Sequence, residues 1–233
     1  MRSCADRLVG IGKQFDVIIA NAGVMACPQG KTADGFETQF GTNHLGHFVL
    51  VNRLAPLVKD GGRVVVLSSA GHRFADVDLD DPNFERTPYK EFIAYGRSKT
   101  ANALFAVGLD KRLKARGIRA MSVHPGGVPT ELGRHATPEA RAELAKLGAA
   151  AGASAAPPIT MKTIPQGAAT SVWCAAVAPA DEIGAHYCED CHIAQVTADP
   201  TSRTGVRAYA IDPARAEALW AKSEEMVGER FTY

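Results

Sequence analysis

The segment Arg63–Ser68 contains an unbroken apolar run, Val64 to Leu67, between two long stretches with helical periodicity. A strand with one face in water alternates apolar and polar residues, whereas a continuous apolar run is typical of a strand buried on both faces. Such strands occur in parallel sheets, because the helical crossovers between parallel strands cover both faces. The run therefore favours an α/β fold built on a parallel sheet.

The flanking segments repeat this alternation. Asp16–Ala20 and Ile118–Val123 are short β-branched runs that end at turn residues, which predicts two further strands. Apolar residues recur at helical spacing over Ala33–Lys59, and Glu91–Arg116 has a helical pattern that stops at a glycine. Strands that alternate with long helices indicate βαβ units, so we expect a Rossmann-like, doubly wound parallel sheet.

The remaining segments have weaker patterns. No internal repeat or linker divides the chain, so we expect residues 1–233 to form one domain. The elements expected elsewhere are a loop or broken helix at 71–90, a helix at 137–147, a loop at 148–158, a helix at 163–178, a weak strand at 185–188 or 193–197, and a C-terminal helix at 212–228 that begins at an Asp N-cap.

Charge and composition exclude several classes of protein. The 233 residues include 26 basic and 25 acidic side chains, so no excess charge points to nucleic acid or an anionic membrane. No apolar run approaches the ~18 residues of a membrane span, and charges within Met1–Lys13 argue against a signal peptide. Five cysteines, an odd number at irregular spacing, suit a reducing compartment. These features predict a soluble, cytoplasmic protein.

A phenol and an ammonium lie one turn apart in the expected helix at 91–116. Tyr95 and Lys99 are at i and i+4 and share a helix face. A nearby positive charge favours the phenolate over the phenol, so Lys99 is expected to lower the pKa of Tyr95. The hydroxyl of Ser69, after the apolar strand, could hold a substrate oxygen while the phenol exchanges its proton. The pair alone is common on ordinary helices, so the interpretation depends on its surroundings.

The order of the motifs resembles the short-chain dehydrogenase/reductase superfamily over nearly the whole chain. The motifs are a strand followed by Asn21-Ala22-Gly23, then Asn43 within a helix, a strand followed by Ser68-Ser69, Tyr95-x-x-x-Lys99, and a strand followed by Pro125-Gly-Gly-Val-Pro-Thr130. The stretches around Asn43 and Tyr95 are similar to the subgroup of retinol dehydrogenases and WW-domain oxidoreductases.

The resemblance implies an oxidoreductase that transfers a hydride reversibly between a nicotinamide and an alcohol or carbonyl carbon. By this resemblance Tyr95 is the general acid/base, Ser69 orients the substrate, Lys99 lowers the pKa of Tyr95 and holds the nicotinamide ribose, and Asn43 keeps a proton-relay water in place. The residues that it places against NAD or NADP, with NADP favoured, are Asn21, Ala22, Gly23, Tyr95, Lys99, Pro125, Gly126, Val128 and Thr130.

Other candidate groups have simpler explanations. The histidines at 44, 47, 72 and 124 are expected to be packing or surface residues rather than acids. His186-x-Cys188-x-x-Cys191-His192 has soft and imidazole ligands at metal-like spacing. It lacks the second Cys-x-x-Cys pair of structural zinc sites, so a packed or substrate-side segment is the expectation, with no metal.

The phosphate-binding segment of such folds has no counterpart here. Members of this superfamily begin with a strand, a Gly-rich turn and a helix whose N-terminus meets the pyrophosphate. Gly10-Ile-Gly12 lacks the third glycine and is expected to end a helix before Asp16. We therefore expect a domain truncated at its N-terminus, without the first three strands, which corresponds to roughly 70–80 residues at ~30 or more per βαβ unit. The residue that would select NAD or NADP belongs to that segment.

The truncation leaves two functional hypotheses open. One is an oxidoreductase acting on a small alcohol, aldehyde or ketone. The other is a non-enzymatic remnant or interaction module of the same fold. Residues 71–90 make the Ser69–Tyr95 segment longer than is usual in compact members, either as surface decoration or as part of substrate selection at the site mouth. Apolar residues on more than one face of the helices at 33–59 and 91–116 are typical of a homodimer interface.

Overall fold

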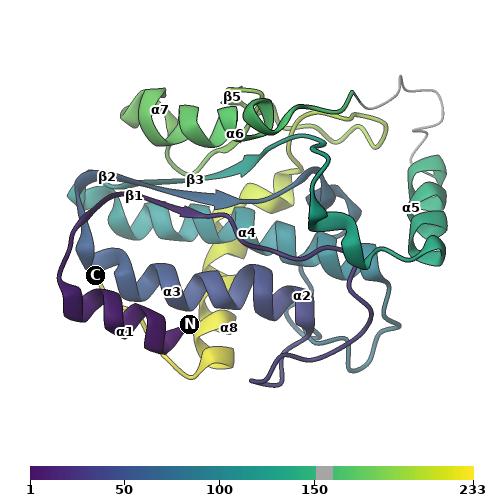
Figure 1. The fold of residues 1–233 in the computed structure, drawn as a ribbon, viewed down its shortest axis with the longest axis horizontal. Coiled ribbons are helices and arrows are strands. Elements are labelled where there is room, and N and C mark those ends of the chain that lie inside the picture. The colour runs from purple at the N-terminus through teal and green to yellow at the C-terminus, as the bar shows by residue number, and fades with distance from the viewer. Residues whose placement is uncertain (151–159) are drawn as a thin grey trace.

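The computed structural model describes residues 1–150 and 160–233, and its strands form one five-stranded sheet. The strands follow one another across the sheet in chain order, and all pairs are parallel except the last. They are β1 (Phe15–Ala20), β2 (Val58–Leu67), β3 (Arg119–His124), β4 (Tyr187–Glu189) and β5 (His192–Ile193). Helices cover both faces (Figure 1), so the predicted α/β fold with a doubly wound parallel sheet is confirmed.

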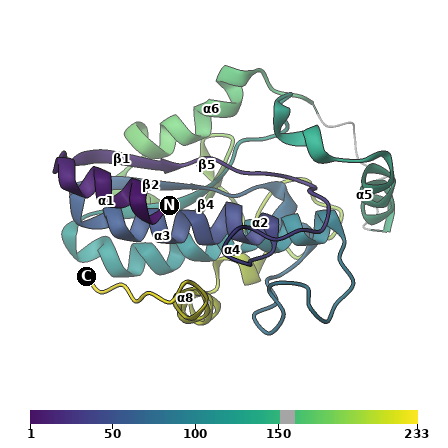
Figure 2. The same cartoon turned by 60° about the horizontal axis from the view of Figure 1, so that its bottom comes forward.

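The helices form one layer on each face of the sheet. α3 and α4 pack on one face, with α1 against α3 and α8 against α4, while α6 and α7 pack on the other (Figures 1 and 2). The α-helices are α1 (Arg2–Ile11), α2 (Thr38–Phe40), α3 (Gly46–Leu54), α4 (Glu91–Leu113), α5 (Pro138–Ala150), α6 (Ile164–Val172), α7 (Ala180–Ile183) and α8 (Pro213–Val227). Within the described residues, no helix combines the length and apolar character needed to cross a membrane.

The helix expected at 33–59 is shorter than predicted at both ends. It begins only at Thr38, because the carboxylate of Glu37 accepts hydrogen bonds from the amides of Gln39 and Phe40 and caps the first turn. It continues through a π-helical turn (Gly41–Leu45), α3 and a short 3-10 turn (Ala55–Leu57). β2 then starts at Val58 rather than at Arg63, with an irregularity in its pairing to β1.

Several predicted ends agree with the structure. α4 and its final 3-10 turn (Lys114–Arg116) end at Gly117, which has φ +68°, and α1 ends at Gly12 with φ +69°. The Asp212 side chain accepts from the Arg215 amide and caps α8, as expected from the sequence. α5 extends three residues beyond the predicted helix, through 148–150 of the expected loop, and residues 151–158 of that loop lie outside the described part of the chain.

The C-terminal half contains elements that the sequence did not predict clearly. The helix expected at 163–178 is α6 followed by a second π-helical turn, Trp173–Val177. The single weak strand expected at 185–188 or 193–197 is instead a hairpin, β4 and β5. Its two turn residues, Asp190 and Cys191, have φ +47° and +57°. Turns of this kind usually contain Asn-Gly, so Asp-Cys does not mark a hairpin in the sequence.

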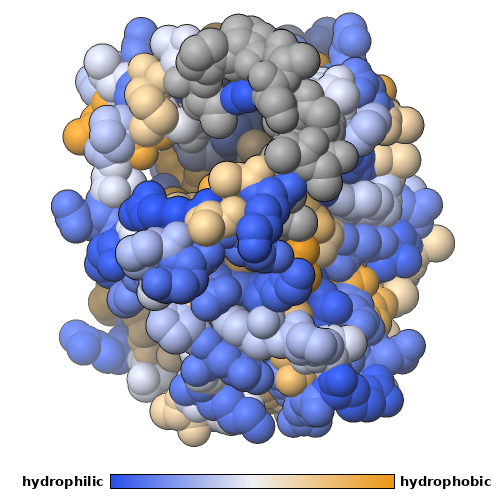
Figure 3. Space-filling model, turned by 90° about the vertical axis from the view of Figure 1, so that its right-hand side faces the viewer, coloured by the Kyte–Doolittle hydropathy of each residue, from blue (hydrophilic) through white to orange (hydrophobic). Residues whose placement is uncertain are grey.

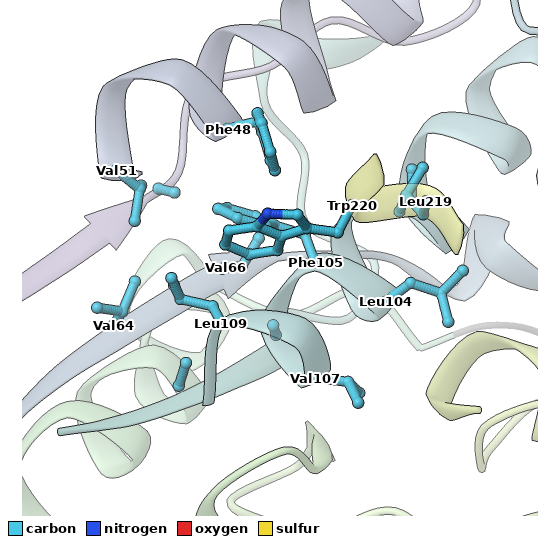
Figure 4. Close-up of a cluster of buried hydrophobic side chains, with 14 of the residues drawn as sticks. Phe48, Val51, Val64, Val66, Leu104, Phe105, Val107, Leu109, Leu219 and Trp220 are labelled. Carbon is cyan, nitrogen blue, oxygen red and sulfur yellow. The ribbon is translucent and has the colours of Figure 1, made fainter. Parts of the chain in front are cut away.

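An aromatic cluster joins α3, α4 and α8 beneath the sheet (Figure 4). The rings of Phe48, Phe105 and Trp220 lie 5.0 to 5.9 Å apart, and all three side chains are at most 3% exposed. Burying a side chain of this size stabilises the fold by about 1.5–3 kcal/mol. The outer face of α4 is thus covered by α8 of the same chain, which accounts for the apolar residues on more than one face of this helix.

β1 is the edge of the described sheet. It pairs only with β2 among the described residues, and Ile19 is 44% exposed. An exposed edge strand presents unpaired backbone groups and apolar side chains to other chains. Among the described residues, β1 therefore leaves this edge of the sheet open to pairing with another chain.

Candidate active site

The predicted site residues gather at the carboxyl ends of the strands. Asn21 follows β1, Ser69 follows β2 and Pro125 follows β3. This end of the molecule faces the viewer in Figure 3, where most of the side chains are hydrophilic. Parallel α/β sheets bind ligands outside the carboxyl ends of their strands, so this end is the candidate active site.

Ser69 and Tyr95 meet directly. The Ser69 hydroxyl lies beside the Tyr95 ring, since a Cβ atom on Gly71 would be 3.5 Å from Ser69 Oγ and 2.6 Å from Tyr95 Cε1. Tyr95 lies in the first turns of α4 and is only 4% exposed. Burial raises the pKa of Tyr95 to about 12, and the neighbouring Ser69 hydroxyl acts in the opposite direction. The expectation that the pKa of Tyr95 would be lowered is thus wrong for this structure, because loss of hydration is the dominant effect on the buried phenol. The phenol retains its proton at neutral pH.

Lys99 lies behind the tyrosine ring. Its Nζ is 5.6 Å from the centroid of the Tyr95 ring and donates to the carbonyl oxygen of Leu67 at 3.0 Å. Burial lowers the pKa of Lys99 to about 8. The hydroxyl of Ser68 donates to the Lys99 carbonyl oxygen at 2.7 Å and so ties the end of β2 to α4. This bond gives Ser68 a structural role.

Both the oxygen and the nitrogen of the Asn43 side-chain amide are hydrogen-bonded. It lies in the π-helical turn Gly41–Leu45 and is fully buried. Its Nδ2 donates to the Val24 carbonyl and the Ser98 hydroxyl, both at 2.9 Å, and its Oδ1 accepts from the Val24 amide at 2.8 Å. Asn43 therefore fixes the turn after β1 against α4. Its predicted role in holding a relay water stays a prediction.

The residues expected against the cofactor lie in two places, the turn after β1 and the loop after β3. Gly23 lies close to the catalytic groups, since a Cβ atom there would be 3.0 Å from Asn43 Oδ1 and 3.7 Å from Lys99 Nζ. Asn21 and Ala22 are exposed beside it. Gly126, after Pro125, has φ +90° and lets the loop turn over the end of β3.

Two residues of that loop are engaged elsewhere in the chain. Val128 packs against α6, where a Cβ on Gly167 would be 2.5 Å from its Cγ2. Thr130 is exposed, and its hydroxyl accepts from the Leu132 amide at 3.3 Å. The structure does not bring these two side chains to the tyrosine.

Only the beginning of the segment at 71–90 reaches the site. Gly71 lies against the Tyr95 ring, and a Cβ atom there would be 2.6 Å from Tyr95 Cε1. The rest folds around Asp81, whose carboxylate accepts from the amides of Glu85, Arg86 and Thr87, and contacts Arg97 on α4. Most of this segment therefore supports the outer side of α4 rather than the mouth of the site.

Sequence reasoning missed three polar residues of the site. Ser98 accepts from Asn43 and donates to the Tyr95 carbonyl oxygen at 2.7 Å, which links the two catalytic candidates. His72 and His124 both bond to the turn that contains Ser69. The signal for His124 was its place at a strand end, directly before Pro125-Gly126. By contrast His44 is a core residue among Phe40, Phe48 and Phe105.

The candidate metal motif does not converge. Cys188 is buried in an apolar cluster beneath β4, whereas Cys191 and His192 are exposed on the hairpin. Across residues 1–150 and 160–233, no group of three or more His, Cys, Asp or Glu side chains could hold a metal ion. Of the four motif residues, only Cys188 is packed in the core, and His186 is exposed like Cys191 and His192.

Comparison with known proteins identifies close relatives. A sequence model of short chain dehydrogenases matches residues 1–141. A probable oxidoreductase of Streptomyces lividans is 40% identical over 210 residues, which cover 88% of this chain and 70% of that protein. Human retinol dehydrogenase 14 is 38% identical over 218 residues, covering 92% and 59% of the two chains. The chain thus spans about 60–70% of the length of these relatives.

Solved structures share the fold. The crystal structure of an uncharacterized protein from Mycobacterium paratuberculosis aligns with a TM-score of 0.69 at 33% identity, over 99% of this chain and 74% of that one. A short chain dehydrogenase of the same species bound to NAD aligns with a TM-score of 0.58 at 24% identity, over 81% and 66% of the chains. One from Burkholderia cenocepacia in complex with NADP aligns with a TM-score of 0.56 at 22% identity, over 81% and 69%.

Proposed function

Because the chain belongs to the short-chain dehydrogenase family, we propose that it transfers a hydride between the nicotinamide of NAD or NADP and a carbonyl or alcohol carbon of a small molecule. The observation that carries the proposal is the convergence of Ser69, Tyr95 and Lys99 at the carboxyl end of the sheet. The serine hydroxyl lies beside the phenol ring, and the ammonium lies behind the same ring.

The proton step belongs to Tyr95. Its raised pKa keeps the phenol protonated at neutral pH, so in the direction of carbonyl reduction it donates its proton to the developing alkoxide. The Ser69 hydroxyl lies beside the phenol, where it orients the carbonyl oxygen. The reverse reaction requires the phenolate, which a charged Lys99 favours. General acid–base catalysis of this kind contributes about 10²–10⁴-fold to the rate.

The residues present fit a nicotinamide dinucleotide on the catalytic side. An ammonium has three N–H donors, and the bond from Lys99 to Leu67 uses one, which leaves donors for the hydroxyls of a ribose. Gly23 lets the turn after β1 pack closely against Asn43 and Lys99, and Gly126 lets the loop after β3 pack against the side chain of Lys162. The nicotinamide would supply or accept the hydride. The proposed contacts of Asn21, Ala22, Pro125, Val128 and Thr130 come from the family resemblance.

Tyr95→Phe tests the proposal. The purified chain is mixed with each reduced dinucleotide and a panel of aldehydes and ketones, and oxidation of the nicotinamide is followed by its absorbance. We expect kcat to fall by about 10²–10⁴-fold in the variant, while the Kd of the dinucleotide changes little. A variant that keeps more than about a tenth of the wild-type kcat would exclude Tyr95 as the acid.

The second candidate is an interaction module of this fold without catalysis. It is favoured by the exposed edge at β1, which could pair with another chain. Calorimetry separates the two proposals, because an interaction module should bind neither NAD nor NADP with a micromolar Kd. A chain that binds a dinucleotide but turns over no substrate in the panel would support the oxidoreductase site and leave its substrate to be found.

The outer face of α4, where the sequence predicted a homodimer interface, is occupied by the chain itself. A partner bound there would have to displace α8, which buries Leu219 and Trp220. We therefore propose that any self-association uses another surface. Light scattering tests this, because a dimer that breaks when α8 is shortened would refute the proposal.

The five cysteines are free thiols, which supports the cytoplasmic location expected from the sequence.

A further inference from the structure

The peptide group between Ser69 and Ala70 is bonded at both of its polar atoms by histidines. The carbonyl oxygen of Ser69 lies 2.8 Å from Nδ1 of His72, in the 3-10 turn that follows. The amide nitrogen of Ala70 lies 3.2 Å from Nδ1 of His124, at the end of β3. One peptide plane is thus held between two imidazole rings from different parts of the fold.

The partners assign opposite tautomers to the two rings. A carbonyl oxygen can only accept, so Nδ1 of His72 carries the hydrogen. Its Nε2 accepts from the Arg207 amide at 3.2 Å and therefore carries none. Nδ1 of His124 accepts from two amides, those of Ala70 and Gly126, the latter at 3.3 Å. The hydrogen of a neutral His124 is then on Nε2.

The surroundings keep both rings neutral. His72 is fully buried and its ring packs against Tyr187, with the ring centroids 4.8 Å apart. Burial lowers the pKa of His72 to about 3, and that of His124 to about 4. The charges of Arg73 and Arg207 near His72, and of Arg73 and Lys162 near His124, act in the same direction, while Asp190 opposes them at His124.

We propose that His72 and His124 are positioning residues that fix the Ser69 hydroxyl against the Tyr95 phenol. The inference deepens the proposed function and rests on it for its kinetic part. His124 also bonds to Gly126, so one ring nitrogen joins the turn that carries the substrate serine to the loop proposed to hold the nicotinamide. His72 joins the same turn to the segment at Arg207. The two rings therefore set the distances from the turn that contains Ser69 to the loop after β3 and to the segment at Arg207.

The tautomers are tested on the free protein, without activity. Two-bond nitrogen–hydrogen correlation spectra of the ¹⁵N-labelled chain at neutral pH distinguish Nδ1–H from Nε2–H. We expect one Nδ1–H ring, assigned by its loss in His72→Asn, and one Nε2–H ring, assigned by its loss in His124→Asn. The same tautomer on both rings, or a charged ring at either position, would overturn the assignment.

Replacing His124 by Asn or by Gln, two amide side chains of different length, tests the positioning role. The side-chain oxygen of Asn can occupy the place of Nδ1, whereas that of Gln reaches toward the place of Nε2. We expect His124→Gln to lower kcat by about 10²-fold through a shift of ~1 Å at Ser69, and His124→Asn to recover most of that loss. His192→Gln, on the exposed hairpin, is the control.

Each outcome decides a different point. Equal kcat values for the Asn and Gln variants of His124, with matched thermal unfolding, would refute the positioning role. A wild-type chain that binds neither NAD nor NADP and transfers no hydride would count against the proposed function and the role together. The tautomer spectra would in that case still decide the assignment of the two rings.

Discussion

Gly71→Ala perturbs the site by one methyl group at a known place. A Cβ atom at this position would lie 2.6 Å from Tyr95 Cε1 and 2.8 Å from Tyr95 Cδ1, where ordinary contacts begin at 3.4 Å. The turn and the ring must therefore separate by roughly 0.8 Å, and a misplacement of about 1 Å in a catalytic group can cost on the order of 10²-fold in rate.

We expect kcat to fall by about 10²-fold in this variant while the Kd of the dinucleotide stays within about twofold. Overpacking a site of this kind costs about 1–3 kcal/mol of unfolding free energy, so the protein should remain folded. Steady-state kinetics, calorimetric titration with the dinucleotide and thermal unfolding measure the three quantities.

Gly10→Ala is the matched control. Gly10 lies in α1, and a Cβ atom there would meet nothing within 4 Å, so alanine should leave kcat unchanged and stabilise the helix slightly, by about 0.5–1 kcal/mol. A Gly71→Ala enzyme with wild-type kcat would show that the contact between the turn and the ring does not set the geometry of the reaction.

Three further predictions concern the charge, the core and the edge. Lys99→Met should lower kcat and also raise the Kd of the dinucleotide at least tenfold, about 1.4 kcal/mol, and calorimetry with an unchanged Kd would contradict the ribose contact. Burial lowers the pKa of His44 from its ordinary value of 6.5 to about 3, so its neutral form stabilises the fold above about pH 6.5 and this contribution is lost as the pH falls toward 3. Denaturant titrations should show that the unfolding free energy falls less steeply with decreasing pH in His44→Gln than in the wild type, by up to about 1.4 kcal/mol per pH unit in that window, and an unchanged slope would refute the assignment. Ile19→Lys, at the exposed edge of β1, should reduce aggregation of the 233-residue chain in light scattering without loss of thermal stability, and unchanged aggregation would show that another surface is responsible.

The sequence predicted those elements whose ends carry strong local signals. Gly117 and Asp212 mark the end of α4 and the start of α8 because a left-handed glycine and an Asp cap act within one turn. The start of α2 was missed because apolar residues before Glu37 continue the helical spacing, while the cap that begins the helix is the Glu37 carboxylate. A capping carboxylate cannot be told from any other acidic residue by spacing.

The candidate site was likewise predictable only in part. The order of the motifs placed Ser69, Tyr95 and Lys99 correctly at one end of the sheet, because parallel strands bring their carboxyl ends together. The direction of the Tyr95 pKa was wrong, since it depends on how far the surrounding chain excludes water. The bond from Arg207 to His72 joins residues 135 positions apart, and no local pattern predicts such a pairing.

Apart from Asn43, the groups proposed to carry out or position the proton step come from one crossover, β2–α4–β3. Ser69 follows its first strand, Tyr95 and Lys99 lie on its helix, and His124 ends its second strand. The turn after β1, the loop after β3 and the helices α5 and α6 are attached to this unit from outside. Exchange of these outer segments between relatives should therefore alter which molecules the protein accepts while the reacting groups stay in register. That separation makes the crossover a natural starting point for building chimaeras with new specificity.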